Sequence, residues 1–470
     1  MFASISTGHL RGRLSTTKNG NQGRVFQGVP YAEIPVGYLR YAEPVPKSKW
    51  EGTLDCFEYP AACMSNSSRT SSPQSQVSED CLYLNLFVGM ECSYENLCPV
   101  VYYIHGGGWM FDSPRMFPEE VLIDNFASQG LIFITVGYRL GSFGFWNTAT
   151  DEAIGNWGMK DIIEGLRWTQ KEIVNFGGNK NRVTIMGHST AGYGVELLTL
   201  SPKAQGLFQQ GIRMSGGGSL GNDTTADKQL AIRAGCATDS SWTEHEFQRI
   251  VDCMREKDGN ELLLIQRQLD DEGFAWSGPR QDGPNGLFPE NEKKLAGKRQ
   301  KCNYMLGTVQ HEFPAIGVNV SLTDVKAACE MFSKEMMGFS NTDEISLACL
   351  EIYTNGGRNQ AYSKILGTML SDAAFFLPTY NAAFSMHETG GNVFLYQFDF
   401  ARTGLEGAAP WHSMDLTYVL GIHPMTYDER DKNINCKSEQ NMAEYEDVPS
   451  TSEKTRLIAS STSETKKNYA

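Results

Sequence analysis

The 470-residue chain contains no long apolar segment. A membrane-spanning helix needs about 18 or more consecutive apolar residues, so we expect no membrane span. The first residues lack the apolar run of a signal peptide, and the last residues, Lys466–Ala470, differ from an endoplasmic-reticulum retention signal. On these absences we expect either a cytosolic protein or a chain that begins after its leader.

Positive charge is also scarce: the chain has 41 Lys and Arg against 55 Asp and Glu, which gives a net charge of −14. Such a surface repels phosphate backbones, so nucleic acid is not an expected partner. The 11 cysteines are too few for a disulfide scaffold, and their odd number leaves at least one thiol unpaired. They form no Cys-x-x-Cys pair and no His lies at zinc-ligand spacing, so we expect no metal site.

Several short apolar runs are present, at residues 100–104, 131–136, 183–186, 211–214 and 393–398. They show no alternation of apolar and polar residues, which indicates a sheet buried on both faces. A helical pattern at residues 162–174 separates two of them. This order predicts an α/β fold with a central, mostly parallel sheet flanked by helices.

One domain is expected over residues 1–426. Residues 221–300 are polar and mixed, with helix-like segments, and we expect them to form a helical insertion over one end of the sheet. Residues 427–470 are rich in Ser, Thr, Glu, Lys and Asn, a composition typical of a polar, mobile C-terminal tail.

Residues 187–192, Gly-His-Ser-Thr-Ala-Gly, follow the run 183–186 directly. A serine on a tight strand-to-helix turn exposes its hydroxyl at the sheet edge, and small residues are needed two positions before and after it. Gly187 meets this need for Ser189, whereas Ala191, also small, stands where a glycine is usual. The following helix N-terminus favours a developing anion. A glycine-rich turn with a capping serine would show the same short pattern.

A second motif, residues 105–109, reads His-Gly-Gly-Gly-Trp after the run 100–104. Consecutive glycines leave backbone N–H groups free to converge on an oxyanion, and each such donor contributes roughly 3 kcal/mol in acyl transfer. A flexible turn is the simpler reading of the glycines alone. Together with the serine turn they form the pairing expected of an α/β-hydrolase.

A serine nucleophile needs a base, which in this fold follows an acid in chain order. Spacing alone does not choose among the histidines that follow Ser189. These are His245, His311, His387, His412 and His423.

Longer motifs carry a family resemblance. Gln-Gly-Val-Pro-Tyr-Ala at residues 27–32, Ser-Glu-Asp-Cys-Leu-Tyr-Leu-Asn at 78–85, Tyr-Arg-Leu-Gly at 138–141 and Phe-Gly-Gly-Asn at 176–179 resemble the type B carboxylesterases. That family also includes cholinesterases and neuroligin-like adhesion proteins. The resemblance implies the α/β-hydrolase fold and hydrolysis of small-molecule carboxylic esters, without a cofactor or metal.

The resemblance also assigns a catalytic triad of Ser189, Glu312 and His412. Glu312 follows a strand-ending Gly at the family's spacing. His412 opens a run similar to the family's His-Gly-x-Glu-Leu, with Ser413 and Asp415 in place of Gly and Glu. The implied function is a serine hydrolase that works through an acyl-enzyme intermediate. The alternative is a catalytically inactive, neuroligin-like binding member of the same fold, against which the intact triad argues.

The family's oxyanion hole maps onto the backbone N–H groups of Gly107, Gly108 and Thr190. Cholinesterases place a tryptophan between their first two paired cysteines, whereas residues 64–80 contain no aromatic residue. A cation–π platform for choline is therefore not expected there. Neutral, moderately apolar esters are the expected substrates.

Structural residues follow from the same resemblance. It implies ion pairs of Arg40 with Glu79 and of Arg139 with Asp161. It implies disulfides Cys63–Cys81 and Cys236–Cys253, which favour an oxidising, secretory or extracellular compartment. N-glycosylation sequons, compatible with a glycoprotein, occur at Asn66, Asn222 and Asn319. Because no signal peptide is apparent, the compartment stays open, as does the oligomeric state.

Overall fold

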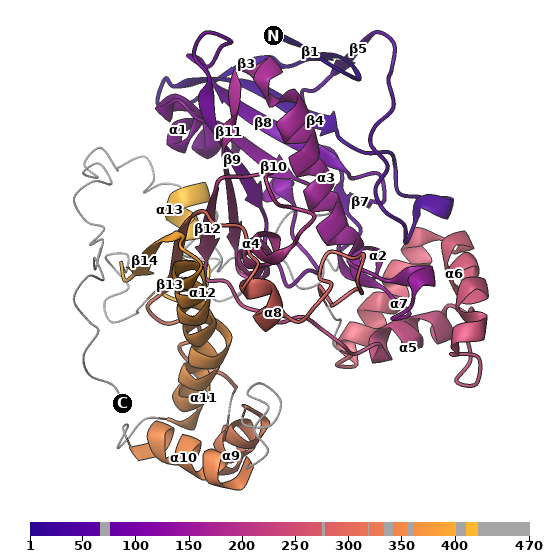
Figure 1. The fold of residues 1–470 in the computed structure, drawn as a ribbon, viewed down its shortest axis with the longest axis vertical. Helices are drawn as coiled ribbons and strands as arrows, with labels where there is room; N and C mark the ends of the chain where they lie inside the picture. The colour runs from indigo at the N-terminus through magenta and orange to yellow at the C-terminus, as the bar shows by residue number, and fades with distance from the viewer. Residues whose placement is uncertain are drawn as a thin grey trace.

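A computed structural model describes residues 1–65, 76–274, 278–317, 319–332, 342–355, 361–400 and 410–421. Its main element is a nine-stranded sheet (Figure 1). In spatial order the strands are β14 (Asn392–Phe398), β13 (Asn303–Val309), β12 (Gln210–Met214), β11 (Gly178–His188), β9 (Cys98–Ile104), β10 (Ile132–Val136), β8 (Tyr83–Gly89), β4 (Gln22–Pro30) and β3 (Arg13–Thr16). Neighbours from β14 to β10 are parallel, and β8, β4 and β3 continue antiparallel. The predicted α/β fold with a mostly parallel sheet is confirmed.

Both faces of the central strands are covered by helices. Tyr102 and Ile104 of β9 pack in one apolar cluster with α3 (Trp157–Glu172) and α4 (Thr190–Leu200). Their neighbour Tyr103 packs in another cluster with α1 (Glu119–Asn125) and α13 (Leu416–Leu420). Successive strand residues therefore point into two different cores, which explains the continuous apolar run in the sequence.

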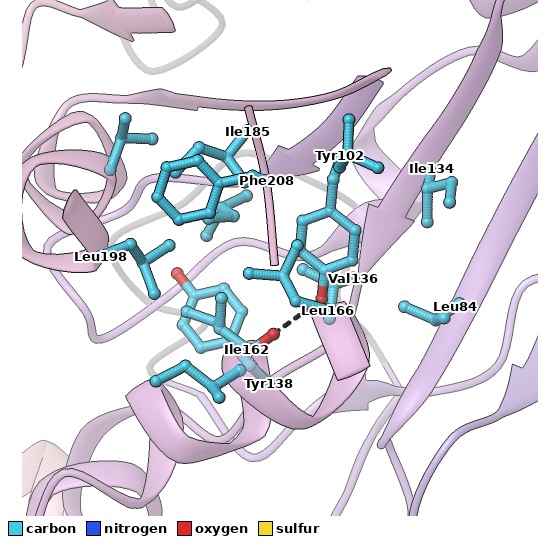
Figure 2. Packing of buried hydrophobic residues seen from close by; sticks show 14 of the residues in the cluster. Leu84, Tyr102, Ile134, Val136, Tyr138, Ile162, Leu166, Ile185, Leu198 and Phe208 are labelled. Atoms are coloured by element: carbon cyan, nitrogen blue, oxygen red, sulfur yellow. Dashed lines mark hydrogen bonds between the residues drawn. The ribbon is translucent and has the colours of Figure 1, made fainter. Parts of the chain in front are cut away.

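Figure 2 shows the first of these cores, where Ile162 and Leu166 of α3 face side chains of the sheet. The buried Tyr102 hydroxyl donates to the carbonyl of Ile162 at 3.1 Å, so its polar atom is satisfied inside the apolar cluster. Leu198 of α4 completes the contact from the other helix.

The prediction of two buried faces is wrong for β14. Its side chains alternate between half-buried and exposed, and Phe394 is 45% exposed. The physical reason is position: β14 is an edge strand, and only β13 pairs with it among the described residues. The apolar run predicted the strand correctly but not its surroundings.

Two helical excursions leave the sheet. Between β12 and β13, where the insertion at residues 221–300 is expected, lie α5 (Thr225–Arg233), α6 (Phe247–Glu256), α7 (Gly259–Asp271) and α8 (Glu292–Ala296). Helices α5 to α7 share an apolar cluster that includes Leu230, Ile250 and Leu262, and this cluster also contains Trp146 and Trp157 from outside the insertion. The expected tail at residues 427–470 lies outside the described residues.

The second excursion, between β13 and β14, was not predicted. It consists of α9 (Leu322–Met331), α10 (Thr342–Asn355), α11 (Tyr362–Ser371), a π-helical turn η9 (Asp372–Phe376) and α12 (Leu377–Glu388). Figure 1 shows α9 and α10 far from the sheet and α12 against it. The turn η9 joins α11 to α12 without a break, and it lies next to the site described below.

Smaller elements complete the fold. The amino-terminal strands β1 (Phe2–Ile5), β2 (Gly8–Arg11) and β5 (Thr53–Asp55) form a separate sheet, and β6 (Ala62–Cys63) pairs with β7 (Val77–Ser78). A short helix α2 (Gly141–Phe145) precedes α3. No helix in the described part of the chain is both long and apolar enough to cross a bilayer.

Disulfides and ion pairs tie these elements together. The structure contains the bonds implied by resemblance, Cys63–Cys81 and Cys236–Cys253, and also Cys92–Cys98 and Cys329–Cys349, which cysteine spacing did not indicate. It also contains both implied ion pairs, with closest N–O distances of 2.6 Å for Arg40–Glu79 and 2.7 Å for Arg139–Asp161. Of the sequon asparagines, Asn222 and Asn319 are exposed, and Asn66 lies outside the described residues.

Candidate active site

Ser189 lies on the turn between β11 and α4, as its motif predicts. Its backbone angles, φ 57° and ψ −128°, fall in a region that non-glycine residues rarely adopt. A hydrogen bond from the Ser189 N–H to the carbonyl of Met214, 2.9 Å long, holds the strained turn against β12. Strain of this kind persists only where the surrounding structure enforces it, and it gathers at functional sites.

Small residues are required around this turn because strand and helix nearly touch. A side-chain carbon added at Gly187 would lie 2.3 Å from the carbonyl oxygen of Ala191, and one added at Gly192 would lie 2.8 Å from the Cα of Gly216. Ala191 itself is fully buried. The spacing rule used to read the sequence therefore has a direct steric cause here.

The glycine-rich loop after β9 lies against the serine. A side-chain carbon on Gly106 would lie 2.6 Å from the carbonyl oxygen of His188 and 3.1 Å from the Cβ of Ser189. Gly107 and Gly108 have φ values of 102° and 63°. Within the described residues, the N–H groups of Gly107, Gly108 and Thr190 donate to no protein acceptor. Free donors beside a serine hydroxyl are what an oxyanion hole requires.

His412 and Glu312 complete a hydrogen-bonded chain to Ser189. The imidazole Nε2 of His412 lies 2.9 Å from the Ser189 hydroxyl oxygen, and Nδ1 lies 2.6 Å from Oε2 of Glu312. The Glu312 side chain is completely buried and also accepts from the Val309 N–H at 3.1 Å. The structure therefore brings together the residues that resemblance assigned. His412 is 223 positions from Ser189 in the sequence and 100 positions from Glu312.

Backbone contacts fix the two loops that carry the acid and the histidine. The N–H of His412 donates to the carbonyl of Glu312 at 3.0 Å, and the N–H of His311 donates to the carbonyl of Pro410 at 3.0 Å. His311 was another candidate for the base, but in the structure its backbone N–H joins the loop of Glu312 to the loop of His412. The pair of bonds sets the imidazole beside the carboxylate.

Three aromatic rings surround the His412 imidazole. Phe313 stacks on it at a centroid distance of 5.8 Å, while Phe375 and His188 each lie at 4.8 Å. His188 is buried, and burial, followed by the proximity of His412, holds its pKa well below the ordinary value. His188 is therefore neutral at pH 7, and these rings restrict the orientations that His412 can adopt.

The sequence did not indicate that the rings of Phe375 and His188 contact His412. Phe375 comes from the π-helical turn η9, which carries no chemical motif. A π-helical turn often marks a functional site, but nothing in the residues Asp372–Phe376 announces one. Among the described residues, no group of three His, Cys, Asp or Glu side chains is arranged to hold a metal ion.

Comparisons with known proteins identify the family of this chain. The model of the carboxylesterase family matches residues 2–447. Carboxylesterase 1F of Mus musculus is 29% identical over 87% of this chain and 79% of its own length, and liver carboxylesterase 1 of Oryctolagus cuniculus is 30% identical over 80% and 71%. Juvenile hormone esterase from Manduca sexta, solved with OTFP covalently attached, superposes with a TM-score of 0.77 and 25% identity, covering 90% of this chain and 84% of that one. The chain therefore belongs to the carboxylesterase family and is a carboxylic ester hydrolase with the α/β-hydrolase fold.

Proposed function

We propose that the chain is a serine hydrolase that cleaves carboxylic esters through an acyl-enzyme intermediate. The observation that carries the proposal is the continuous hydrogen-bonded chain from the Ser189 hydroxyl through His412 to the buried Glu312 carboxylate. A serine hydroxyl becomes a useful nucleophile only when a base accepts its proton and an acid orients that base.

The mechanism follows from these roles. The Ser189 oxygen attacks the ester carbonyl while its proton passes to Nε2 of His412. Glu312 accepts a hydrogen bond from Nδ1–H and stabilises the imidazolium that forms. The imidazolium then protonates the leaving alcohol as the C–O bond breaks and the acyl-enzyme remains.

Deacylation repeats the sequence with water as the nucleophile. Water gives its proton to His412, attacks the acyl carbonyl, and the Ser189 oxygen leaves with the proton from the imidazolium. In both steps the oxyanion would accept from the N–H groups of Gly107, Gly108 and Thr190. Each donor of this type contributes roughly 3 kcal/mol to the transition state.

Neutral, moderately apolar esters are the proposed substrates. The Phe313 and Phe375 rings stand beside His412, where the leaving alcohol must receive its proton. Apolar rings at that position favour apolar alcohols over charged ones because burying a charge there has no compensating partner.

The test is covalent labelling with a fluorophosphonate probe, which reacts with activated serines and needs no knowledge of the substrate. Wild type, Ser189→Ala and a control at a half-buried serine outside the site, Ser128→Ala, are compared after thermal melting shows that each is folded. We expect labelling of wild type and Ser128→Ala and none of Ser189→Ala. A folded wild type that is not labelled would overturn the serine mechanism and favour the non-catalytic, binding alternative.

A further inference from the structure

Ser371 is a buried serine at the end of α11, and the mechanism above does not use it. It is 2% exposed. Its hydroxyl accepts a hydrogen bond from the N–H of Phe313 at 2.9 Å and donates one to the carbonyl of Gly367, one helical turn earlier, at 2.7 Å. Phe313 directly follows the acid Glu312 in the chain. The hydroxyl therefore joins the helix to the segment that carries the acid.

The acid loop, which we define as residues 312–316, lies along one face of α11. The N–H of Ile316 donates to the carbonyl of Ser363 at 2.8 Å. A side-chain carbon added at Gly367 would lie 2.4 Å from the carbonyl oxygen of Phe313. The three helix positions that contact the loop are spaced four residues apart, so they share one face of the helix. The small residues on this face allow the loop to approach the helix closely.

The same helix continues into the π-helical turn η9, which contacts the base. The ring centroid of Phe375 lies 4.8 Å from that of His412 and 5.5 Å from that of Phe313. A side-chain carbon added at Gly217, after β12, would lie 2.9 Å from the Phe375 ring. The N–H of Gly217 donates to the carbonyl of Ser189 at 3.4 Å. One continuous helical element therefore packs against the segments that carry the acid, the base and the nucleophile.

We propose that Ser371 is a positioning residue of the active site: its hydroxyl fixes the acid loop so that the Glu312 carboxylate stays at hydrogen-bonding distance from His412. The inference rests on the proposed function. The carboxylate oxygen lies 2.6 Å from Nδ1 of His412, and a hydrogen bond weakens steeply when its geometry is disturbed. A small displacement of the acid loop would therefore release the imidazole from the orientation that acyl transfer requires.

The first experiment measures kcat for an ester at saturation in wild type, Ser371→Ala and Ser371→Thr. In Ser371→Ala the Phe313 N–H loses its acceptor inside the protein, so the acid loop must move to find another. We expect kcat to fall about tenfold or more, because a displacement of about 1 Å can cost about 100-fold. Ser371→Thr should stay within about twofold of wild type, since a threonine hydroxyl makes the same bond to the preceding turn.

Thr368→Ala is the matched control. Thr368 lies on the exposed face of the same helix, and its hydroxyl makes the same kind of bond, to the carbonyl of Lys364 at 3.0 Å. Loss of that bond should leave kcat unchanged. Melting curves show that each variant is folded at the assay temperature. A Ser371→Ala protein that melts earlier but keeps the wild-type kcat would show a merely structural serine and overturn the proposal.

The second experiment needs no activity. The proton in a short bond between an imidazole and a carboxylate resonates far downfield in the proton NMR spectrum, and its loss in His412→Ala identifies the signal. We expect the signal at one position in wild type, Thr368→Ala and Ser371→Thr. In Ser371→Ala it should move upfield or disappear. An unchanged signal in Ser371→Ala would mean that the contact of Glu312 with His412 does not depend on the serine hydroxyl, which overturns the positioning role.

The two measurements separate this inference from the proposed function. If wild type neither hydrolyses esters nor reacts with the fluorophosphonate, while the NMR signal responds to Ser371→Ala, the proposed function is overturned and the positioning of Glu312 stands. If wild type is active and both kcat and the signal are unchanged in Ser371→Ala, only the present inference is overturned.

Discussion

The centre and the edge of the sheet support the two halves of the site in different ways. At the centre, every residue of β10 is buried, and β9 and β11 carry the glycine loop and Ser189 between two apolar cores. At the edge, β14 has no fully buried residue, yet the neighbouring loops carry Glu312 and His412. The difference shows that nucleophile and base are positioned by different forces.

Backbone sterics hold the nucleophile half. A side-chain carbon added at Gly106 or Gly187 would lie closer to its neighbours than the normal contact distance. The turn is therefore tightly packed and has little freedom to move. The base half depends on a few directional interactions, since His412 is 18% exposed and is held by hydrogen bonds and neighbouring rings. Ester hydrolysis requires the nucleophile and the base together, whereas we expect the free energy of unfolding to depend mainly on the buried centre of the sheet.

The largest expected effect joins the two halves. Ser189→Ala and His412→Ala should each lower kcat/KM by about 10⁴-fold or more, because a triad acts as a unit. For the same reason the double variant should lose little more than either single one. Steady-state kinetics on an ester checks this, and losses that multiply in the double variant would show that centre and edge act independently.

A second change affects the centre alone. Gly106→Ala places a methyl group against the carbonyl of His188, so the oxyanion loop must move. We expect kcat to fall by about 10²-fold or more, the effect of losing one oxyanion donor. Gly297→Ala is the matched control, since its added carbon meets nothing nearer than 3.7 Å and should leave kcat unchanged. Equal rates for the two variants would contradict the steric account.

A third pair compares the stability of the two regions. Ile134→Ala in β10 removes a fully buried side chain and should lower the free energy of unfolding by about 2–5 kcal/mol. Phe394→Ala in β14 removes a half-exposed ring and should cost less than about 1 kcal/mol. Urea unfolding measures both, and similar losses would remove the distinction between centre and edge.

The smallest expected effect concerns Asp415 and depends on pH. Burial raises its folded-state pKa to about 7, above the ordinary value, so the folded state binds more protons than the unfolded state between about pH 4 and pH 7. Wild type should therefore lose stability as pH rises through this window, and Asp415→Asn should not. The gap in favour of the variant should grow by about 1–3 kcal/mol. Unfolding curves that stay parallel from pH 4 to pH 7 would contradict the raised pKa.

Local motifs in the sequence predicted much of the central half. The apolar runs predicted the parallel strands, and small residues around Ser189 predicted the strained turn, because these features depend on neighbours close in the chain. Family motifs, not spacing, selected Glu312 and His412 from several candidates. Neither kind of reasoning identified Phe375 or the burial of Asp415, whose neighbours lie on other strands and helices.

The sequence by itself therefore determined the fold class, the serine turn and the glycine-rich loop beside it, since period, turn geometry and the small size of glycine are local properties. Only the tertiary structure showed which rings surround His412 and that the Asp415 side chain is buried. Those outcomes depend on contacts between residues far apart in the chain, such as His188 with His412 and Phe375 with His412, and such contacts exist only after the chain has folded.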